Sequence, residues 1–170
     1  YLRKDARMME FASVVNRMLA KDPEGRRRKL RLRTYAVVIL NEESALMQWV
    51  NNTAGMRGEI GRCYSMCRLK PPTTIAKELR PVFDDIQTQQ GAGTLSCEAA
   101  AARYRAEILP SFPAVYHRWF PWAFPDPTGW LEARTAFGRS GAVWSMVGHV
   151  IGLGDRHGEN VLLAKTSGEC

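Results

Sequence analysis

The spacing of apolar residues predicts an amphipathic helix near the start of the chain, over residues 2–20. The apolar positions recur at intervals of three and four, as they do on one face of a helix: Met8, Phe11, Val15 and Met18. A proline and a glycine follow at Pro23 and Gly25, and both residue types interrupt helices. We therefore expect the helix to end before them.

Two strands are predicted next. Residues 30–40, LRLRTYAVVIL, begin with period-two alternation and end as an apolar run, which is typical of a strand that enters a core. NEES at 41–44 predicts a turn, and ALMQWV at 45–50 predicts a second strand antiparallel to the first. NNTAG at 51–55 contains turn formers and a glycine, so we expect it to interrupt regular structure.

The rest of the chain is predicted to be mainly helical. Helices are expected over 75–87 and 97–109, with the flexible sequence TQQGAGT between them. In DPTGW, Asp126 is typical of an N-cap and Pro127 of a first helical residue. Apolar positions between 142 and 151 predict one face of a further helix, followed by a polar loop and the short strand NVLLAK.

This order of elements predicts an α+β chain, in which a small mixed region precedes a larger helical region. No internal repeat is visible. The longest apolar run, YAVVIL, has six residues, whereas a membrane-spanning helix needs roughly 20. The composition, with 45% hydrophobic and 24% charged residues, is ordinary for a globular protein.

The net charge of +7 is concentrated at the start of the chain. Residues 1–33 hold 11 Lys or Arg against 4 Asp or Glu, and the remaining residues hold 13 of each kind. The cluster RRRKLRLR at 26–33 is of the kind that binds nucleic acid or an anionic membrane. Its alternative is a solvated loop leading into a strand, which the absence of interleaved aromatic residues favours.

Four cysteines lie at positions 63, 67, 97 and 170. Their spacing matches neither a paired zinc motif nor a dense disulfide framework. Free, reduced cysteines are the default interpretation.

The sequence IGLGDRHGENVLL at 151–163 places polar residues between two apolar flanks. A solvated turn is the simplest interpretation, and a phosphoryl-transfer site is the alternative. Such a site needs a carboxylate to accept the proton of the attacking hydroxyl and an oxygen ligand for a hard cation. Asp155 and Asn160 are five positions apart, as the Asp and Asn of protein-kinase catalytic loops are.

The longer string GLGDRHGEN resembles the catalytic loop of the phosphatidylinositol 3-kinase-related kinases, in which Asp-Arg-His replaces the usual His-Arg-Asp. The resemblance implies that Asp155 orients and deprotonates the substrate hydroxyl. It implies that His157 donates a hydrogen bond to the transferring phosphate and that Asn160 binds magnesium. Arg156 is expected to brace the loop, and Glu159 to be solvated.

Further strings extend the resemblance along the chain. YLRKDARMMEF is similar to the family's Leu-Arg-x-Asp helix, which implies that Asp5 lies near the ATP-binding lysine and the phosphates. RTYAVVIL and LMQWVNNTAG are similar to the strand pair that leads to the hinge. By this match Tyr35 lines the inner adenine pocket, Trp49 and Val50 form the hinge with Trp49 packed on adenine, and Leu162 forms the pocket floor. Ordinary core packing is the alternative role for Trp49.

The resemblance implies part of a bilobal protein-kinase-like fold. Residues 1–50 would be the end of the small N-lobe, and 51–170 the C-lobe with the catalytic loop at 152–163. The family's phosphate-binding lysine would precede Tyr1, and its metal-binding Asp-Phe-Gly would follow Cys170. We therefore expect a piece of a longer protein, inactive by itself.

WVNNTAG, FPDPTGW and SGEC look closest to ATR-type DNA-damage checkpoint kinases. This implies a serine/threonine protein kinase that uses ATP with Mg²⁺, or Mn²⁺ in its place. It further implies protein substrates with Ser or Thr before Gln and a helical regulatory partner of the ATR-interacting type. The expected location is the nucleus, with indirect contact with DNA through a larger complex and no membrane contact. The rival hypotheses are a phosphoinositide lipid kinase of the same superfamily, a non-catalytic nucleic-acid-binding module built on residues 26–33, and a pseudokinase, against which the intact Asp155, His157 and Asn160 argue.

Overall fold

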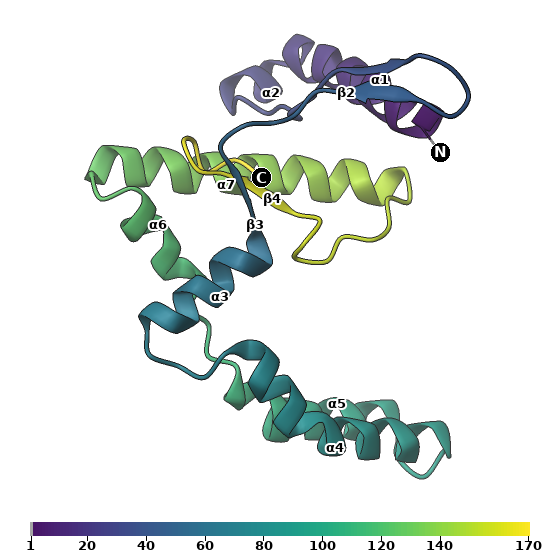
Figure 1. Cartoon of the computed structure of the whole chain (residues 1–170), viewed down its shortest axis with the longest axis vertical. Coiled ribbons are helices and arrows are strands. Elements are labelled where there is room, and N and C mark those ends of the chain that lie inside the picture. The colour runs from purple at the N-terminus through teal and green to yellow at the C-terminus, as the bar shows by residue number, and fades with distance from the viewer. Residues whose placement is uncertain (1) are drawn as a thin grey trace. The chain divides into compact units, whose positions relative to one another are not determined.

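A computed structural model describes residues 2–170, and Tyr1, the first residue of YLRKDARMMEF, lies outside the described residues. The chain divides into two compact units, of which unit 1 holds Tyr1–Met56 and Phe120–Cys170, and unit 2 holds Arg57–Trp119. The elements in chain order are α1 (Leu2–Lys21), α2 (Pro23–Arg27), β1 (Val37–Ile39), β2 (Ala45–Met47), β3 (Thr53–Gly55), α3 (Met56–Met66), α4 (Pro72–Gly91), α5 (Cys97–Arg103), the short π-helix η1 (Tyr104–Ile108), the 3₁₀ helices η2 (Leu109–Ser111) and η3 (Tyr116–Arg118), α6 (Trp119–Ala123), α7 (Pro127–Val150) and β4 (Leu162–Ala164) (Figure 1).

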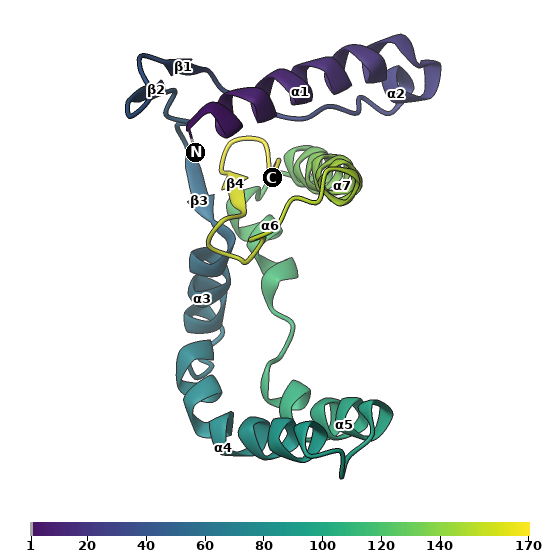
Figure 2. The same ribbon diagram turned by 90° about the vertical axis from the view of Figure 1, so that its right-hand side faces the viewer.

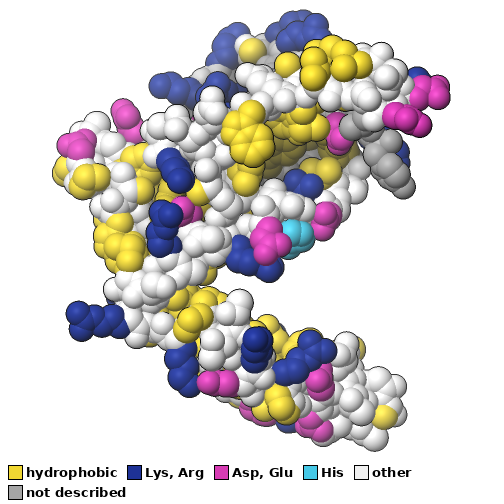
Figure 3. Space-filling view, in the orientation of Figure 1, with side chains coloured by type: hydrophobic (Ala, Val, Ile, Leu, Met, Phe, Trp, Pro, Cys, Tyr) yellow, Lys and Arg dark blue, Asp and Glu magenta, His cyan; other side chains and the backbone are white. Residues whose placement is uncertain are grey.

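Helices α1 and α7 enclose the core of unit 1. Ala12 of α1, Leu32 and Val143 of α7 are buried against one another, and residues around them complete the cluster: Val15, Leu19, Leu30, Trp144 and Val147. The helix predicted over 2–20 is confirmed as α1, which supplies Ala12, Val15 and Leu19 to this core. Phe11 and Met18 of the predicted apolar face are exposed. Asp22 then caps α2, because its carboxylate accepts a hydrogen bond from the Gly25 backbone N–H. Lys and Arg side chains gather over α1 and α2 (Figure 3).

The first strand pair confirms the predicted hairpin but is shorter than predicted. β1 and β2 pair antiparallel, with Val38 opposite Leu46. Of the predicted strand 30–40, only Val37–Ile39 belongs to the ladder. Leu32 is buried, whereas Val38 and Leu40 are exposed, so the apolar end of this segment does not enter the core as predicted.

The prediction that residues 51–55 interrupt regular structure is wrong. Thr53–Gly55 form β3, which pairs antiparallel with β4, so that Thr53 lies opposite Ala164 and Gly55 opposite Leu162 (Figure 2). The turn formers do act just before the strand, since Asn52 has a φ of 57°. The hydrogen-bonding partner of β3 lies more than 100 residues further along the chain, and a local pattern cannot reveal such a partner.

Helix α7 begins as the sequence predicts. The Asp126 carboxylate accepts a hydrogen bond from the Gly129 N–H at 2.8 Å, and Pro127 is the first helical residue. The helix continues to Val150, and the strand predicted after the polar loop is confirmed as β4. Val143 is buried, but Met146 and Val150 of the predicted apolar face are exposed.

Unit 2 consists of helices and turns in the described residues. The predicted helix 75–87 is confirmed within α4, but α4 continues to Gly91 and so includes the first part of TQQGAGT, which was predicted to be flexible. The predicted helix 97–109 is formed by α5, η1 and the start of η2. Its core contains Ile86, Ala100 and Ile108, with Leu79, Val82, Leu95 and Phe112 packed against them. The lobe boundary between residues 50 and 51 stays a prediction. In the described part of the chain, no helix has the length and apolar character required to cross a bilayer.

Candidate active site

The end of α7 sets the direction of the polar loop. The Gly152 N–H donates to the His149 carbonyl at 3.2 Å, and the Leu153 N–H donates to the Gly148 carbonyl at 2.8 Å. Gly152 has a φ of 64°, so these two bonds form a Schellman motif with glycine in the left-handed position. The motif ends the helix and turns the chain toward Asp155.

Asp155 and Asn160 are in direct contact. The Asn160 Nδ2 group donates to the Asp155 carboxylate oxygen Oδ2 at 2.8 Å and to the Asp155 carbonyl oxygen at 3.0 Å. Asp155 has a φ of 58°, a left-handed conformation that Asp tolerates better than most residues. The two side chains that the sequence selected five positions apart therefore form one polar group.

His157 lies on the other carboxylate oxygen of Asp155. Its Nε2 is 3.4 Å from Asp155 Oδ1, and its Nδ1 accepts a hydrogen bond from the Glu159 backbone N–H at 3.2 Å. A backbone N–H can only donate, so Nδ1 carries no proton in this arrangement and the neutral ring is protonated at Nε2. The N–H of His157 is thus directed toward the side of the loop that holds the carboxylate.

Arg156 braces the loop as expected, because its Nε donates to the Gly154 carbonyl at 2.9 Å. The group is open to solvent, with 75% of the Asp155 side chain and 42% of the His157 side chain exposed. An open carboxylate and an open imidazole can reach a bound substrate, and they carry little desolvation penalty without one. Glu159 is also mostly exposed, as the sequence predicted.

The ladder between β3 and β4 connects the predicted hinge to the polar loop. The Met56 N–H donates to the Val161 carbonyl at 2.9 Å, and the Lys165 N–H donates to the Asn52 carbonyl at 2.8 Å. The Thr53 hydroxyl donates to the Val50 carbonyl at 3.1 Å. Leu162, opposite Gly55, therefore lies in the strand beside the one that follows the predicted hinge.

Trp49 is 82% exposed, so ordinary core packing does not explain it. An indole left open to solvent next to a strand pair can stack on a planar ligand. Val50, the next residue, is half-buried.

Asp5 lies in α1, and Tyr35 lies in the segment that leads into β1. A surface hollow of about 410 Å³ lies between α1 and the segment that leads into β1, and the described residues lining it include Tyr35, Glu10 and Gln48 but not Asp5. Asp5 is exposed in the first turn of α1. The structure thus joins Asp155, His157 and Asn160 by direct contacts, whereas Asp5 lies in α1 and Tyr35 in the segment before β1.

The oxygen atoms of the loop suit a magnesium ion that arrives with a nucleotide. Asn160 uses its Nδ2 toward Asp155, which leaves its amide oxygen outside that contact. Mg²⁺ prefers oxygen ligands and is commonly held by one or two protein groups together with substrate phosphates and water. Within residues 2–170, no group of three or more His, Cys, Asp or Glu could hold a metal ion alone, so phosphate oxygens would have to complete the shell.

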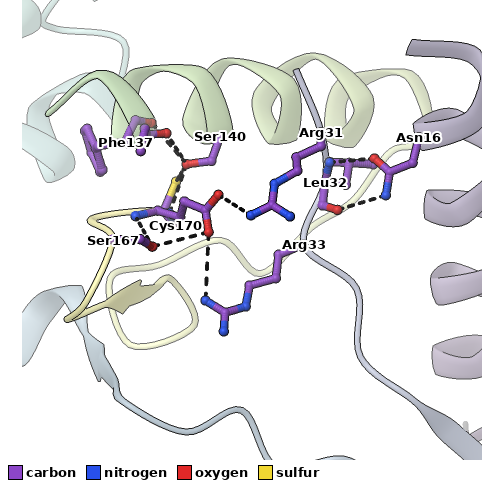
Figure 4. A network of polar contacts seen from close by, with 10 residues as sticks. Asn16, Arg31, Leu32, Arg33, Phe137, Ser140, Ser167 and Cys170 are labelled. Atoms are coloured by element: carbon purple, nitrogen blue, oxygen red, sulfur yellow. Dashed lines mark hydrogen bonds and ion pairs between the residues drawn. The ribbon is translucent and has the colours of Figure 1, made fainter. Parts of the chain in front are cut away.

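Sequence reasoning missed a second polar network in unit 1, between the turn after β4, α7 and residues 31–33. Glu169 lies in the turn after β4 and pairs with Arg31 and Arg33, and Ser140 of α7 bonds to Cys170 (Figure 4). The charge cluster at 26–33 was the available signal, but nothing local in the sequence shows which carboxylate meets it.

The chain matches the family described as phosphatidylinositol 3- and 4-kinase over residues 1–170. It is 45% identical over 169 residues to the serine/threonine-protein kinase ATR of Oryza sativa subsp. indica, covering 99% of this chain and 6% of that protein. It is 40% identical over 168 residues to protein kinase rad3 of Schizosaccharomyces pombe, covering 99% of this chain and 7% of that protein.

The structure resembles the solved FAT and kinase domain of CtTel1, with a TM-score of 0.79 and 35% sequence identity over 99% of this chain and 11% of that one. This likeness confirms the predicted fold class, a part of a kinase domain that is mostly helical with small antiparallel sheets. The family match spans every residue of the sequence. On both grounds, the chain belongs to the phosphatidylinositol 3- and 4-kinase family.

Proposed function

We propose that the chain is the central part of the catalytic domain of an ATP-dependent serine/threonine protein kinase of the DNA-damage checkpoint, similar to ATR. The observation that carries the proposal is the contact between the Asp155 carboxylate and the Asn160 amide, at 2.8 Å, in a loop between a helix and a strand. The relatives named serine/threonine-protein kinase ATR and protein kinase rad3 support a protein substrate over a lipid.

In this proposal Asp155 orients the substrate hydroxyl and accepts its proton as the oxygen attacks the terminal phosphorus of ATP. The Nε2–H of His157 donates to the phosphate oxygens that gain charge in the transition state. The Asn160 amide oxygen would hold Mg²⁺, or Mn²⁺, which offsets phosphate charge when bound. Arg156 keeps the loop in shape through Gly154.

Nucleotide recognition is assigned to the hinge side of the β3–β4 ladder. Trp49 would pack on adenine, Val50 would supply the hinge backbone, and Leu162 would form the floor beneath the base. The exposure of Trp49 and the pairing of Leu162 with Gly55 support these roles. Tyr35 would line the inner end of the pocket, and Asp5 would lie near the phosphates from α1.

The wider setting follows from the same likeness. We infer substrates with Ser or Thr before Gln, a helical regulatory partner of the ATR-interacting type, and a nuclear protein that meets DNA indirectly through its complex. The chain spans only 6–7% of the length of the curated relatives described above. Efficient transfer is therefore expected from the whole protein and not from these 170 residues alone.

The basic segment gives less support to a nucleic-acid-binding module than its sequence does. Arg27 and Arg28 pair with Glu24 at 2.7 and 3.2 Å. Two further arginines of the segment, Arg31 and Arg33, face Glu169. Four of the six cationic side chains in residues 26–33 thus lie beside a carboxylate of the same chain, two arginines to each carboxylate.

The test is Asp155→Ala in the full-length protein, with phosphate transfer measured on a Ser-Gln peptide and on phosphatidylinositol vesicles. General base catalysis typically contributes about 10²–10⁴-fold, so we expect a loss of this size on the peptide, with nucleotide binding retained. Glu132→Ala, an exposed acid of α7, is the matched control. Unchanged turnover in Asp155→Ala would refute the catalytic role, and transfer to vesicles alone would establish the lipid kinase.

A further inference from the structure

The turn after β4 is fixed to two other parts of unit 1. Within the turn, the Ala164 N–H donates to the Glu169 carbonyl at 2.7 Å, and the Gly168 N–H donates to the Ala164 carbonyl at 2.8 Å. At its end, the Cys170 N–H donates to the buried Ser140 hydroxyl of α7 at 2.9 Å. The turn is therefore continuous with the strand that follows the polar loop, and it is attached to the helix that precedes that loop.

Gly168 brings the turn against α7 at the closest distance that the backbone permits. A Cβ atom at this position would lie 2.7 Å from the Ala133 carbonyl oxygen and 2.9 Å from the Ala133 Cβ. The φ of Gly168 is 74°, which also excludes most side chains. Position 168 thus fixes the distance between the turn and α7.

The carboxylate of Glu169 points from this turn to the basic segment. Its Oε1 accepts a hydrogen bond from Arg31 Nη2 at 2.7 Å, and its Oε2 lies 4.0 Å from Arg33 Nη1 (Figure 4). The Glu169 side chain is 19% exposed, so water screens these pairs less than it screens an open surface pair. The contact joins residues 138 positions apart.

The residue between the two arginines connects the same segment to α1. Leu32 is buried in the core with Ala12 and Val143. The Asn16 side chain of α1 accepts a hydrogen bond from the Leu32 N–H at 2.7 Å and donates to the Leu32 carbonyl at 2.9 Å. Side chains alternate along an extended segment, so Leu32 faces the core while its two neighbours face Glu169.

We propose that Glu169, through Arg31 and Arg33, is a positioning residue that holds the turn after β4 to α1 and thereby fixes the polar loop of Asp155 and Asn160 relative to α1. The inference rests on the proposed function for its catalytic consequence, but the contact itself can be tested without activity. It gives the basic segment a role inside the protein, because Arg31 and Arg33 form the cationic side of the contact with Glu169. We call these three residues the clamp.

The test uses hydrogen–deuterium exchange on the full-length protein carrying Glu169→Gln or Arg31→Gln. Arg27→Gln is the matched control, because it removes an arginine of the same segment whose partner, Glu24, is only three residues away. In both clamp variants we expect exchange at residues 152–163 to rise several-fold over wild type, with exchange in α4 and α5 unchanged. In the control we expect no change at residues 152–163.

Equal exchange at residues 152–163 in wild type and both clamp variants would overturn the proposal. A rise of the same size in α4 and α5 would also overturn it, because that result means global destabilisation. The double variant Arg31→Gln/Glu169→Gln should match Glu169→Gln, because loss of the Glu169 charge already weakens the contacts with Arg31 and Arg33, and the change at Arg31 then removes no further ion pair. Additive effects of the two changes would show that the residues act separately.

The catalytic consequence is measured on the same proteins. We expect kcat to fall several-fold in both clamp variants while the KM for ATP stays near wild type, because the loop is displaced and the hinge is not. If kcat is unchanged although exchange at residues 152–163 rises, Glu169 has no positioning role in catalysis. If wild type and Asp155→Ala transfer phosphate equally, the proposed function fails while the exchange result still decides the clamp.

Discussion

Unit 1 and unit 2 are stabilised by contacts of different reach along the chain. In unit 1, Thr53 pairs with Ala164 and Arg31 pairs with Glu169, and each pair joins segments more than 100 residues apart. In unit 2, Arg103 pairs with Glu107 one helical turn away and with Asp85 in the helix before it. The polar loop belongs to unit 1, where contacts span more than 100 residues, whereas the Tyr64 hydroxyl and the Pro113 carbonyl that it binds in unit 2 are 49 residues apart.

This difference indicates which substitutions should disturb the polar loop of the candidate site. Helix-local contacts form as soon as the helix does, whereas a ladder between distant segments needs the whole unit. A change in the β3–β4 region should therefore affect the polar loop, and a change of similar size in α4 should stay within unit 2. The predictions below are ordered from the largest expected effect to the smallest.

Leu163→Ala should have the largest effect on stability. Leu163 is completely buried in β4, and truncating a buried leucine typically destabilises by about 2–5 kcal/mol. Denaturation of the full-length protein, followed by hydrogen exchange of each segment, measures the loss. We expect faster exchange in β3 and in residues 152–163.

Ile86→Ala is the matched change in unit 2, where Ile86 is buried in the α4 core. It should raise exchange in α4 and α5 and leave β3 unchanged. Faster exchange of both units in either variant would show that the contrast between them is wrong.

Gly168→Ala should come next. A left-handed conformation at a residue other than glycine costs about 1–2 kcal/mol, and the overlap with Ala133 adds an overpacking penalty of about 1–3 kcal/mol. Gly93→Ala separates the two effects, because Gly93 has nearly the same φ, 73°, but nothing within 4 Å of an added Cβ. Equal unfolding free energies for the two variants would contradict the close packing of the turn on α7.

The cysteines of unit 2 should differ strongly in reactivity. Burial raises the pKa of the Cys63 thiol, and the neighbouring Cys67 and Glu59 act in the same direction, so less thiolate is present at pH 8. Cys97 is exposed. Timed alkylation with iodoacetamide, followed by mass spectrometry, should label Cys97 first and Cys63 only when α3 opens. Simultaneous labelling would mean that the Cys63 thiol is not buried.

Acid should have the smallest effect, confined to α4, α5 and η1. Hydrogen bonds from Gln89 and Arg103 lower the pKa of Asp85, and the Arg103 hydrogen bond lowers the pKa of Glu107. Both carboxylates bind protons less readily in the folded state. Their stabilisation is therefore complete above the unfolded-state pKa of about 4 and is lost as pH falls through the lower folded-state values.

Segment-resolved exchange between pH 5 and pH 2 measures this loss after correction for the intrinsic pH dependence of exchange. In Arg103→Gln, the rise in exchange of α4 and α5 on acidification should be slightly smaller than in wild type. The difference is small because water screens the ion pairs of Arg103 with Asp85 and Glu107. A larger rise in exchange on acidification in the variant would contradict the lowered pKa values of Asp85 and Glu107.

The sequence by itself determined the longer helices, the N-terminal cap of α7 and the identity of the loop residues. Apolar spacing predicts α1, and Asp126 with Pro127 predicts where α7 begins, since these signals lie within a few residues of one another. The interval between Asp155 and Asn160 was also visible, and a short loop can bring such residues together.

Only the tertiary structure decided that residues 53–55 form a strand, that Trp49 stays exposed, and that Glu169 meets Arg31. A strand needs hydrogen-bonding partners on another segment, and an ion pair needs a carboxylate that arrives from elsewhere. Those partners lie more than 100 residues away in this chain. Local spacing specifies what a segment can form, and the packing of distant segments specifies which of those structures is completed.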